Sequence, residues 1–159
     1  MRRGLRLLAG LVLGTVAGIA AASTAAQTTL RFNVLLDGDP IGQHRFELRE
    51  SGPTREVLSQ ADFRVRLLFL DLYRYRHTAT ERWLGNCLEA LNARTDDNGE
   101  IETVAARRSG DGLVVDATRT QGRHGGCVRS FAYWHPRILD GGRLLNAQTG
   151  SYQPIRVLP

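Results

Sequence analysis

The sequence has no lysine, and all 21 of its basic residues are arginine. Motifs that would identify an enzyme are missing as well: there is no G-x-S-x-G elbow, no phosphate-binding glycine loop, no H-E-x-x-H and no C-x-x-C. The 159 residues are 42% hydrophobic and 23% charged, which is ordinary for a globular protein and excludes a disordered tail or a fibrous repeat. This length suits one domain rather than two.

The first 26 residues have the pattern of a secretory signal peptide. Three arginines precede 16 uncharged residues, Leu7–Ala22, and the small residues of Ser23–Ala26 follow. A transmembrane helix needs roughly 20 strongly apolar residues, and this run is shorter and diluted by alanine and glycine. No cysteine follows it, so a lipid anchor is not expected. We expect cleavage near Ala26, export to the periplasm by the general or the twin-arginine route, and a mature chain without a transmembrane span.

Cleavage there changes the charge balance. The mature chain keeps 18 of the 21 arginines and all 16 acidic residues, which gives a net charge of +2. Nucleic-acid-binding proteins usually show a strong basic excess on one face. We therefore expect no nucleic-acid partner.

Cys87 and Cys127 are the only cysteines. In an exported chain an even number of cysteines predicts a disulfide, and both lie next to turns where the backbone can approach closely. Two buried free thiols are the alternative, and a metal site is disfavoured because two thiols supply too few ligands. Closing a loop of about 40 residues would stabilise the fold by roughly 4 kcal/mol in the chain-entropy account.

The mature chain, residues 27–159, alternates between apolar and polar residues nearly throughout, as in Leu30, Phe32, Val34 and Leu36. Turn sequences recur about every ten residues and begin with Asp37-Gly38-Asp39-Pro40, a strong hairpin signal. We therefore predict one all-β domain of eight to ten antiparallel strands, in a strongly curved sheet or barrel. Only Ser130–Leu139 leaves room for a turn or two of helix.

The stretch Val57–Trp83 has one apolar and aromatic face and one arginine-rich face. A straight strand of this length would measure roughly 90 Å, so we expect a bend or break at Leu68–Leu72. The arginine face has two interpretations. It is either a solvated surface that discourages strand pairing or a surface that grips anionic envelope polymers such as lipopolysaccharide.

The apolar face of this stretch carries the candidate site. Asp71, Tyr73, Tyr75, His77 and Glu81 are predicted to point inward with the aromatic residues, and polar groups there need partners. One interpretation is a packed core with an internal hydrogen-bond network. The other is a cavity beside Tyr75 and His77 that binds an apolar or amphipathic molecule. The ligand-binding residues predicted for that cavity are Phe63, Phe69, Tyr73, Tyr75, His77, Glu81 and Trp83.

Catalytic residues, metal ligands and cofactors are not predicted. A hydrolase that uses His77 with Glu81 or Asp71 lacks any nucleophile pattern, which leaves the question of an enzyme open but disfavoured. The histidines lie too far apart in sequence to indicate a metal clasp, and Asp96-Asp97-Asn98-Gly99 fits a hairpin turn better than a calcium loop.

Four segments resemble a family of exported proteobacterial proteins that is defined as a domain of unknown function: LDGDPIGQHRF, YRYRHTATERWLGNCLEALNARTDDNG, GCVRSFAYWHP and LLNAQTG. The Ser-Phe-Ala-Tyr-Trp and Leu-Asn-x-Gln-Thr-Gly pieces are its most specific parts. The resemblance implies a periplasmic β domain and carries no activity, ligand or catalytic residue. In architecture the chain is also similar to periplasmic lipid-handling proteins with half-open β barrels, although fold does not fix function.

Two function classes follow. The first is a periplasmic binding protein for a lipid-like or other apolar envelope molecule. The second is a structural or interaction protein of the envelope with no small-molecule ligand. The sequence names no protein partner and no oligomeric state.

Overall fold

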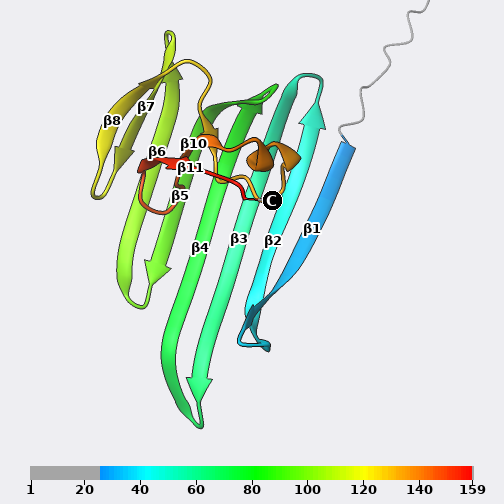
Figure 1. The fold of residues 1–159 in the computed structure, drawn as a ribbon, viewed down its shortest axis with the longest axis vertical. Coiled ribbons are helices and arrows are strands. Elements are labelled where there is room, and N and C mark those ends of the chain that lie inside the picture. Colours follow the sequence, from blue (N-terminus) through cyan, green and yellow to red (C-terminus); the bar gives the residue numbers. More distant parts are fainter. Residues whose placement is uncertain (1–25, 159) are drawn as a thin grey trace, which may run out of the picture.

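A computed structural model describes residues 26–158, which form two β-sheets. The larger sheet is antiparallel and the smaller one is mixed. The main sheet contains eight strands in sequence order, each antiparallel to the next (Figure 1). Its strands are β1 (Ala26–Leu36), β2 (Asp39–Ser51), β3 (Thr54–Leu67), β4 (Leu70–Leu84), β5 (Cys87–Asp97), β6 (Glu100–Ser109), β7 (Gly112–Ala117) and β8 (Gln121–Gly125). The predicted signal peptide lies outside the described residues apart from Ala26.

The prediction of an antiparallel all-β domain is confirmed. Of the two predicted forms, a curved sheet or a barrel, the chain forms the sheet. Among the described strands, β1 and β8 pair on one side only, so the sheet is open and does not close into a barrel. The eight strands of the main sheet fall within the predicted range of eight to ten, whereas the described residues hold eleven strands in all, and one pair of strands in the smaller sheet is parallel. In the part of the chain that the structure describes, no helix is long and apolar enough to cross a membrane.

A second, smaller sheet follows the meander. It contains β9 (Arg129–Ser130), β10 (Gly142–Leu145) and β11 (Tyr152–Ile155), with β9 and β10 parallel. A short 3-10 helix, η1 (Pro136–Asp140), lies between β9 and β10 and overlaps the end of Ser130–Leu139, the segment with room for a turn or two of helix. Figure 1 shows this C-terminal segment lying across one face of the main sheet. We call that face the inner face and the segment from Val128 to Ile155 the C-terminal segment.

The predicted break in Val57–Trp83 is a hairpin: β3 ends at Leu67, Leu68 and Phe69 form the turn, and β4 begins at Leu70. A register shift just after Val65 brings the inner-face residues of the two strands opposite one another, as in Ala61 with His77 and Phe63 with Tyr75. Asp71 is a correction. It lies beside the turn, where its exposed carboxylate pairs with Arg66 at 2.8 Å instead of pointing into the core. The cause is a register shift just after Val65.

The C-terminal segment closes the core against β4 to β7. Leu88, Leu91, Leu113, Val128, Leu144 and Leu145 are fully buried. The predicted disulfide is confirmed between Cys87 and Cys127, which are 40 residues apart. Next to it, the backbone N–H of Leu88 donates to the carbonyl of Val128 at 2.8 Å. The disulfide therefore fixes the start of the C-terminal segment to the start of β5.

Candidate functional site

The inner face is hollow where the C-terminal segment stands over β1 to β4. A cavity of about 620 Å³ opens there, within the range of small-molecule sites. The strands contribute Phe32, Val34, His44, Phe46, Ser59, Ala61, Phe63, Tyr75, His77, Ala79 and Glu81 to its lining, and the C-terminal segment contributes Phe131, Tyr133, Trp134, Asn146, Ala147 and Gln148. The cavity is partly open to solvent, so a ligand has a route into it.

Small side chains on the central strands explain the hollow. Ser59 and Ala79 pair directly across β3 and β4, and Ala61 is the next inner-face residue of β3. All three are buried, but none is large enough to reach the C-terminal segment above them. The packed part of the same face carries Leu91, Val104, Leu113 and Val115 beside the smaller Ala93 and Ala106. Residue size at these three positions therefore leaves room on the sheet side of the cavity, and the distance of the C-terminal segment from the sheet sets the rest of its volume.

Aromatic rings form the walls. Phe63 and Tyr75 stack with their ring centroids 5.2 Å apart at one end, and Phe32 meets Phe46 edge to face at 5.9 Å on another side. Trp134 lines the cavity and lies perpendicular to the buried Trp83, with the two ring centroids 5.4 Å apart. Such surfaces offer broad apolar contact to a bound molecule.

Two neutral histidines are among the polar residues that line the cavity. His44 Nε2 lies 2.8 Å from Ser59 Oγ, and His77 Nδ1 lies 2.8 Å from Thr95 Oγ1. Among the described residues, the second ring nitrogen of each histidine has no hydrogen-bond partner. Burial lowers the pKa of both rings, and that of His77 falls to about 4. Both are therefore uncharged at neutral pH, when each can offer one nitrogen to a polar group of a ligand.

Glu81 is enclosed by its partners. Ser130 Oγ donates to Oε1 at 2.7 Å, and Trp83 Nε1 donates to Oε2 at 2.8 Å. Burial raises the pKa of the carboxyl group, and these hydrogen bonds partly oppose that rise. Since both oxygens are already engaged, Glu81 joins the C-terminal segment to β4. It is poorly placed to hold a ligand head group.

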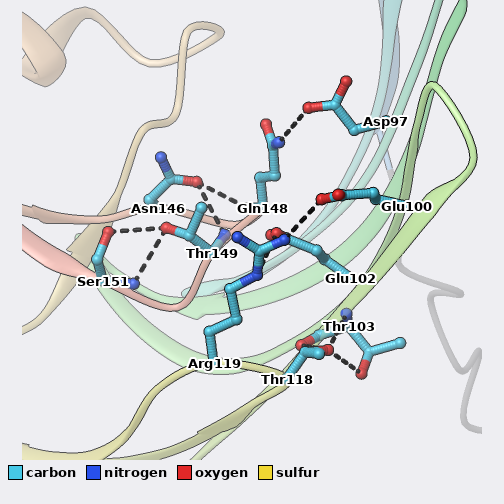
Figure 2. Close-up of polar contacts among 10 residues, drawn as sticks. All are labelled: Asp97, Glu100, Glu102, Thr103, Thr118, Arg119, Asn146, Gln148, Thr149 and Ser151. Atoms are coloured by element: carbon cyan, nitrogen blue, oxygen red, sulfur yellow. Dashed lines mark hydrogen bonds and ion pairs between the residues drawn. The ribbon is translucent and has the colours of Figure 1, made fainter.

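We call the part of the C-terminal segment that lines the cavity its roof. A turn at Asn146–Ser151 holds the roof in place, as Figure 2 shows. The Asn146 Oδ1 atom accepts from the backbone N–H groups of Gln148 at 2.7 Å and Thr149 at 3.2 Å. Gln148 then bridges to the sheet: its Nε2 donates to Asp97 Oδ2 at 3.2 Å, and its Oε1 accepts from Tyr75 OH at 3.1 Å. The turn is thereby anchored to the sheet. We call the sheet residues Ser59, Ala61 and Ala79 the floor of the cavity.

The Leu-Asn-x-Gln-Thr-Gly piece has a physical explanation in this turn. Gly150 has a φ of 74°, and a Cβ atom there would lie 2.6 Å from the Cβ of Ala117. Only glycine allows the turn to approach β7 so closely. The Ser-Phe-Ala-Tyr-Trp piece is explained similarly: Ser130 binds Glu81, and the three aromatic residues line the cavity.

Four of the predicted ligand-binding residues line the cavity: Phe63, Tyr75, His77 and Glu81. The other three do not. Phe69 lies in the exposed hairpin turn. The alternation of faces, on which its prediction depended, does not hold through a turn that projects from the core. Tyr73 is half-buried and donates to Asp97 Oδ1 at 2.7 Å, and Trp83 is fully buried in the packed core.

Sequence reasoning missed the roof and the floor. The roof residues lie far from the long strand pair in sequence, so only their membership in distinctive sequence pieces could have marked them. Ser59, Ala61 and Ala79 were visible as small residues on the inner face, and their size was the available signal. Within the described residues, no three histidine, cysteine or acidic side chains gather in a way that could hold a metal ion.

Comparison with known proteins gives one match. Residues 32–159 match the family described as a domain of unknown function (DUF6134). No curated protein and no solved structure matches the chain.

Proposed function

This chain belongs to the DUF6134 family, and we propose that it is a periplasmic protein that binds a lipid-like or other apolar molecule in the cavity of its inner face. The cavity itself carries the proposal. It has the volume of a small-molecule site, aromatic walls and only a few polar groups, which is the usual composition of a site for an apolar ligand.

Its polar groups favour an amphipathic ligand with an uncharged or weakly polar end. His44 and His77 are neutral, and Glu81 is occupied by Ser130 and Trp83. Among the described residues, no arginine lines the cavity, so an anionic head group would find no cation inside it. An acyl or isoprenoid chain with a hydroxyl, ester or protonated carboxyl group fits these walls best.

Two observations support the proposed periplasmic location. The disulfide between Cys87 and Cys127 requires an oxidising compartment to persist in most organisms. A cut after Ala26 would remove one residue of β1 and leave its pairing with β2 intact from Gln27 onward. Sequencing of the N-terminus of protein recovered from the periplasm tests this part of the proposal.

The binding proposal is tested with a cavity-filling variant. Ala61→Phe places a ring on the floor of the cavity, whereas Ala105→Phe adds the same ring to the exposed outer face of β6. We expect native mass spectrometry of gently purified wild-type protein to show bound lipid. Titration of hexadecanoic acid or farnesol should change the fluorescence of Trp134, which lines the cavity.

The Ala61→Phe variant should bind at least about tenfold more weakly, which corresponds to 1.4 kcal/mol, while Ala105→Phe should bind like wild type. Wild-type protein that carries no lipid and responds to neither probe would overturn the proposal. That result would favour a structural or interaction protein without a small ligand.

A further inference from the structure

The β3–β4 turn differs in composition from the other tight turns of the main sheet. Six of the hairpins have a two-residue turn, and five of these contain glycine beside a polar residue or proline: Asp37-Gly38, Gly52-Pro53, Gly85-Asn86, Asn98-Gly99 and Gly110-Asp111. The sixth is Leu68-Phe69. Leu68 adopts a φ of 55°, in the left-handed region that glycine or asparagine occupies with less strain. Turn formation therefore does not account for the choice of residues here.

The turn is also the most exposed apolar part of the sheet. Leu68 is 82% exposed and Phe69 is 94% exposed, and Leu70 and Leu72 continue the patch along β4. Figure 1 shows the β3–β4 hairpin reaching beyond the neighbouring β1–β2 and β5–β6 turns at the same end of the sheet. We call residues 68–72 of this hairpin the tip. Large exposed apolar patches usually mark a surface that is covered in the working state of a protein.

Arginines lie directly behind the tip. Arg64 and Arg74 are cross-strand neighbours, an arrangement of like charges that is unfavourable in an isolated sheet. Arg74 reaches Asp96 at only 3.5 Å, and in the described part of the chain no carboxylate lies within 4.0 Å of Arg64. Arg64 and Arg74 each lie at least four residues along their strand from the turn. At the usual rise of a strand, this places them roughly 13 Å behind the apex of the hairpin. A pair of guanidinium groups suits phosphate oxygens at that depth.

We propose that the tip inserts into a lipid bilayer, with Arg64 and Arg74 at the level of the lipid phosphates. A narrow, protruding apex of leucine and phenylalanine fits the deformable interior of a bilayer, whereas a protein interface of stable size needs a broad complementary surface. The acidic residues nearby do not prevent this. Asp71 is paired with Arg66. Asp37 and Asp39, from the neighbouring β1–β2 hairpin, line the same surface hollow as Arg64 and Arg66, so the arginines offset their charge.

Docking in this way turns one end of the cavity toward the membrane. The wall formed by Phe63 and Tyr75 lies between the cavity and the tip along the same two strands. The membrane proposal goes beyond ligand binding and does not depend on it, because flotation with vesicles can succeed even where the cavity binds nothing.

Vesicle flotation tests the proposal directly. Processed wild-type protein is mixed with vesicles of phosphatidylethanolamine and phosphatidylglycerol, beside the double variant Leu68→Ser/Phe69→Ser. Leu139→Ser is the matched control, because Leu139 is 67% exposed but lies in η1, away from the tip. All proteins carry the same N-terminus, and circular dichroism verifies that each variant retains its β fold.

We expect wild type and Leu139→Ser to float and the double variant to lose at least about tenfold in vesicle binding. Arg64→Gln/Arg74→Gln should weaken binding to these vesicles more than to vesicles of phosphatidylcholine alone. In a Phe69→Trp variant, brominated lipids should quench the new indole. Wild type that fails to float, or a double variant that floats equally well, would overturn the proposal. So would lipid-free dimers that the tip substitutions convert to monomers.

Discussion

The two halves of the inner face are built on the same sheet but have opposite interiors. Over β4 to β7, buried side chains of the sheet such as Leu88 and Leu113 pack with Leu145 of the C-terminal segment and fill the space. Over β1 to β4, the same segment spans Ser59, Ala61 and Ala79 and leaves a cavity of about 620 Å³. Register shifts interrupt the β1–β2 pairing after Val34, the β3–β4 pairing after Val65 and the β4–β5 pairing after Arg82, whereas the pairings from β5 to β8 have none. The difference indicates that side-chain volume helps to divide one sheet into a packed part and a hollow part.

The largest effect on stability is expected from removing the disulfide in the packed half. Replacing both cysteines by serine removes the cross-link that holds the C-terminal segment at β5, and the chain-entropy account predicts a loss of about 4 kcal/mol in the free energy of unfolding. Urea denaturation of Cys87→Ser/Cys127→Ser against oxidised wild type measures it. A loss below about 1 kcal/mol would mean that the C-terminal segment is held by its other contacts alone.

The comparison between the halves is sharpened by one truncation in each. Leu145→Ala opens a void in the packed half and should lower the free energy of unfolding by about 3 kcal/mol. Phe63→Ala removes a larger side chain, but one that is half-buried beside existing space, so we expect a loss of only about 1 kcal/mol. Equal losses in paired urea titrations would show that the hollow half is packed as tightly as the other.

A smaller effect is expected from acidification, which acts on the hollow half. The folded protein holds the pKa of His77 at about 4, whereas the unfolded chain has the ordinary value of 6.5. Between these values the unfolded state binds the extra proton, so the stability contributed by neutral His77 is present above pH 6.5 and is lost as the pH falls. From pH 7 to pH 5, this group should lower the free energy of unfolding by about 2 kcal/mol.

The matched variant is His77→Gln, which retains a side chain able to hydrogen-bond Thr95 but cannot titrate. Its loss of stability between pH 7 and pH 5 should be smaller than that of wild type by the same amount. Glu81 acts in the opposite direction, because burial raises the pKa of its carboxyl group, and its contribution cancels when the two proteins are compared at each pH. Identical pH dependence in both proteins would contradict the assignment of His77 as a buried neutral ring.

Much of the fold could be predicted from local pattern. The alternation in Val57–Trp83 predicted which face each residue would occupy, and the crowding of apolar residues at Leu68–Leu72 predicted where the run would break. The pairing of Cys87 with Cys127 followed from the cysteine count and from the expectation of export. Antiparallel neighbours are close in sequence, so their signals survive in short windows.

The site could be predicted only in part, because its roof comes from contacts between distant segments. Tyr75 and Gln148 are 73 residues apart, and the parallel pairing of β9 with β10 leaves no periodic signal in so few residues. Phe69 was placed inside because alternation alone does not show that a turn projects beyond the core. Whether aromatic walls enclose space depends on the distance between sheet and roof, which residue types do not encode.

The measurement that tests the central claim most directly is a crystal structure of the protein grown with bromine-tagged hexadecanoic acid. Anomalous scattering locates the bromine without reference to the rest of the ligand. We predict a bromine peak inside the hollow half, between the Ala61 floor and the roof at Tyr133 and Gln148. A cavity without ligand, with bromine absent or found only on the outer surface, would contradict the account.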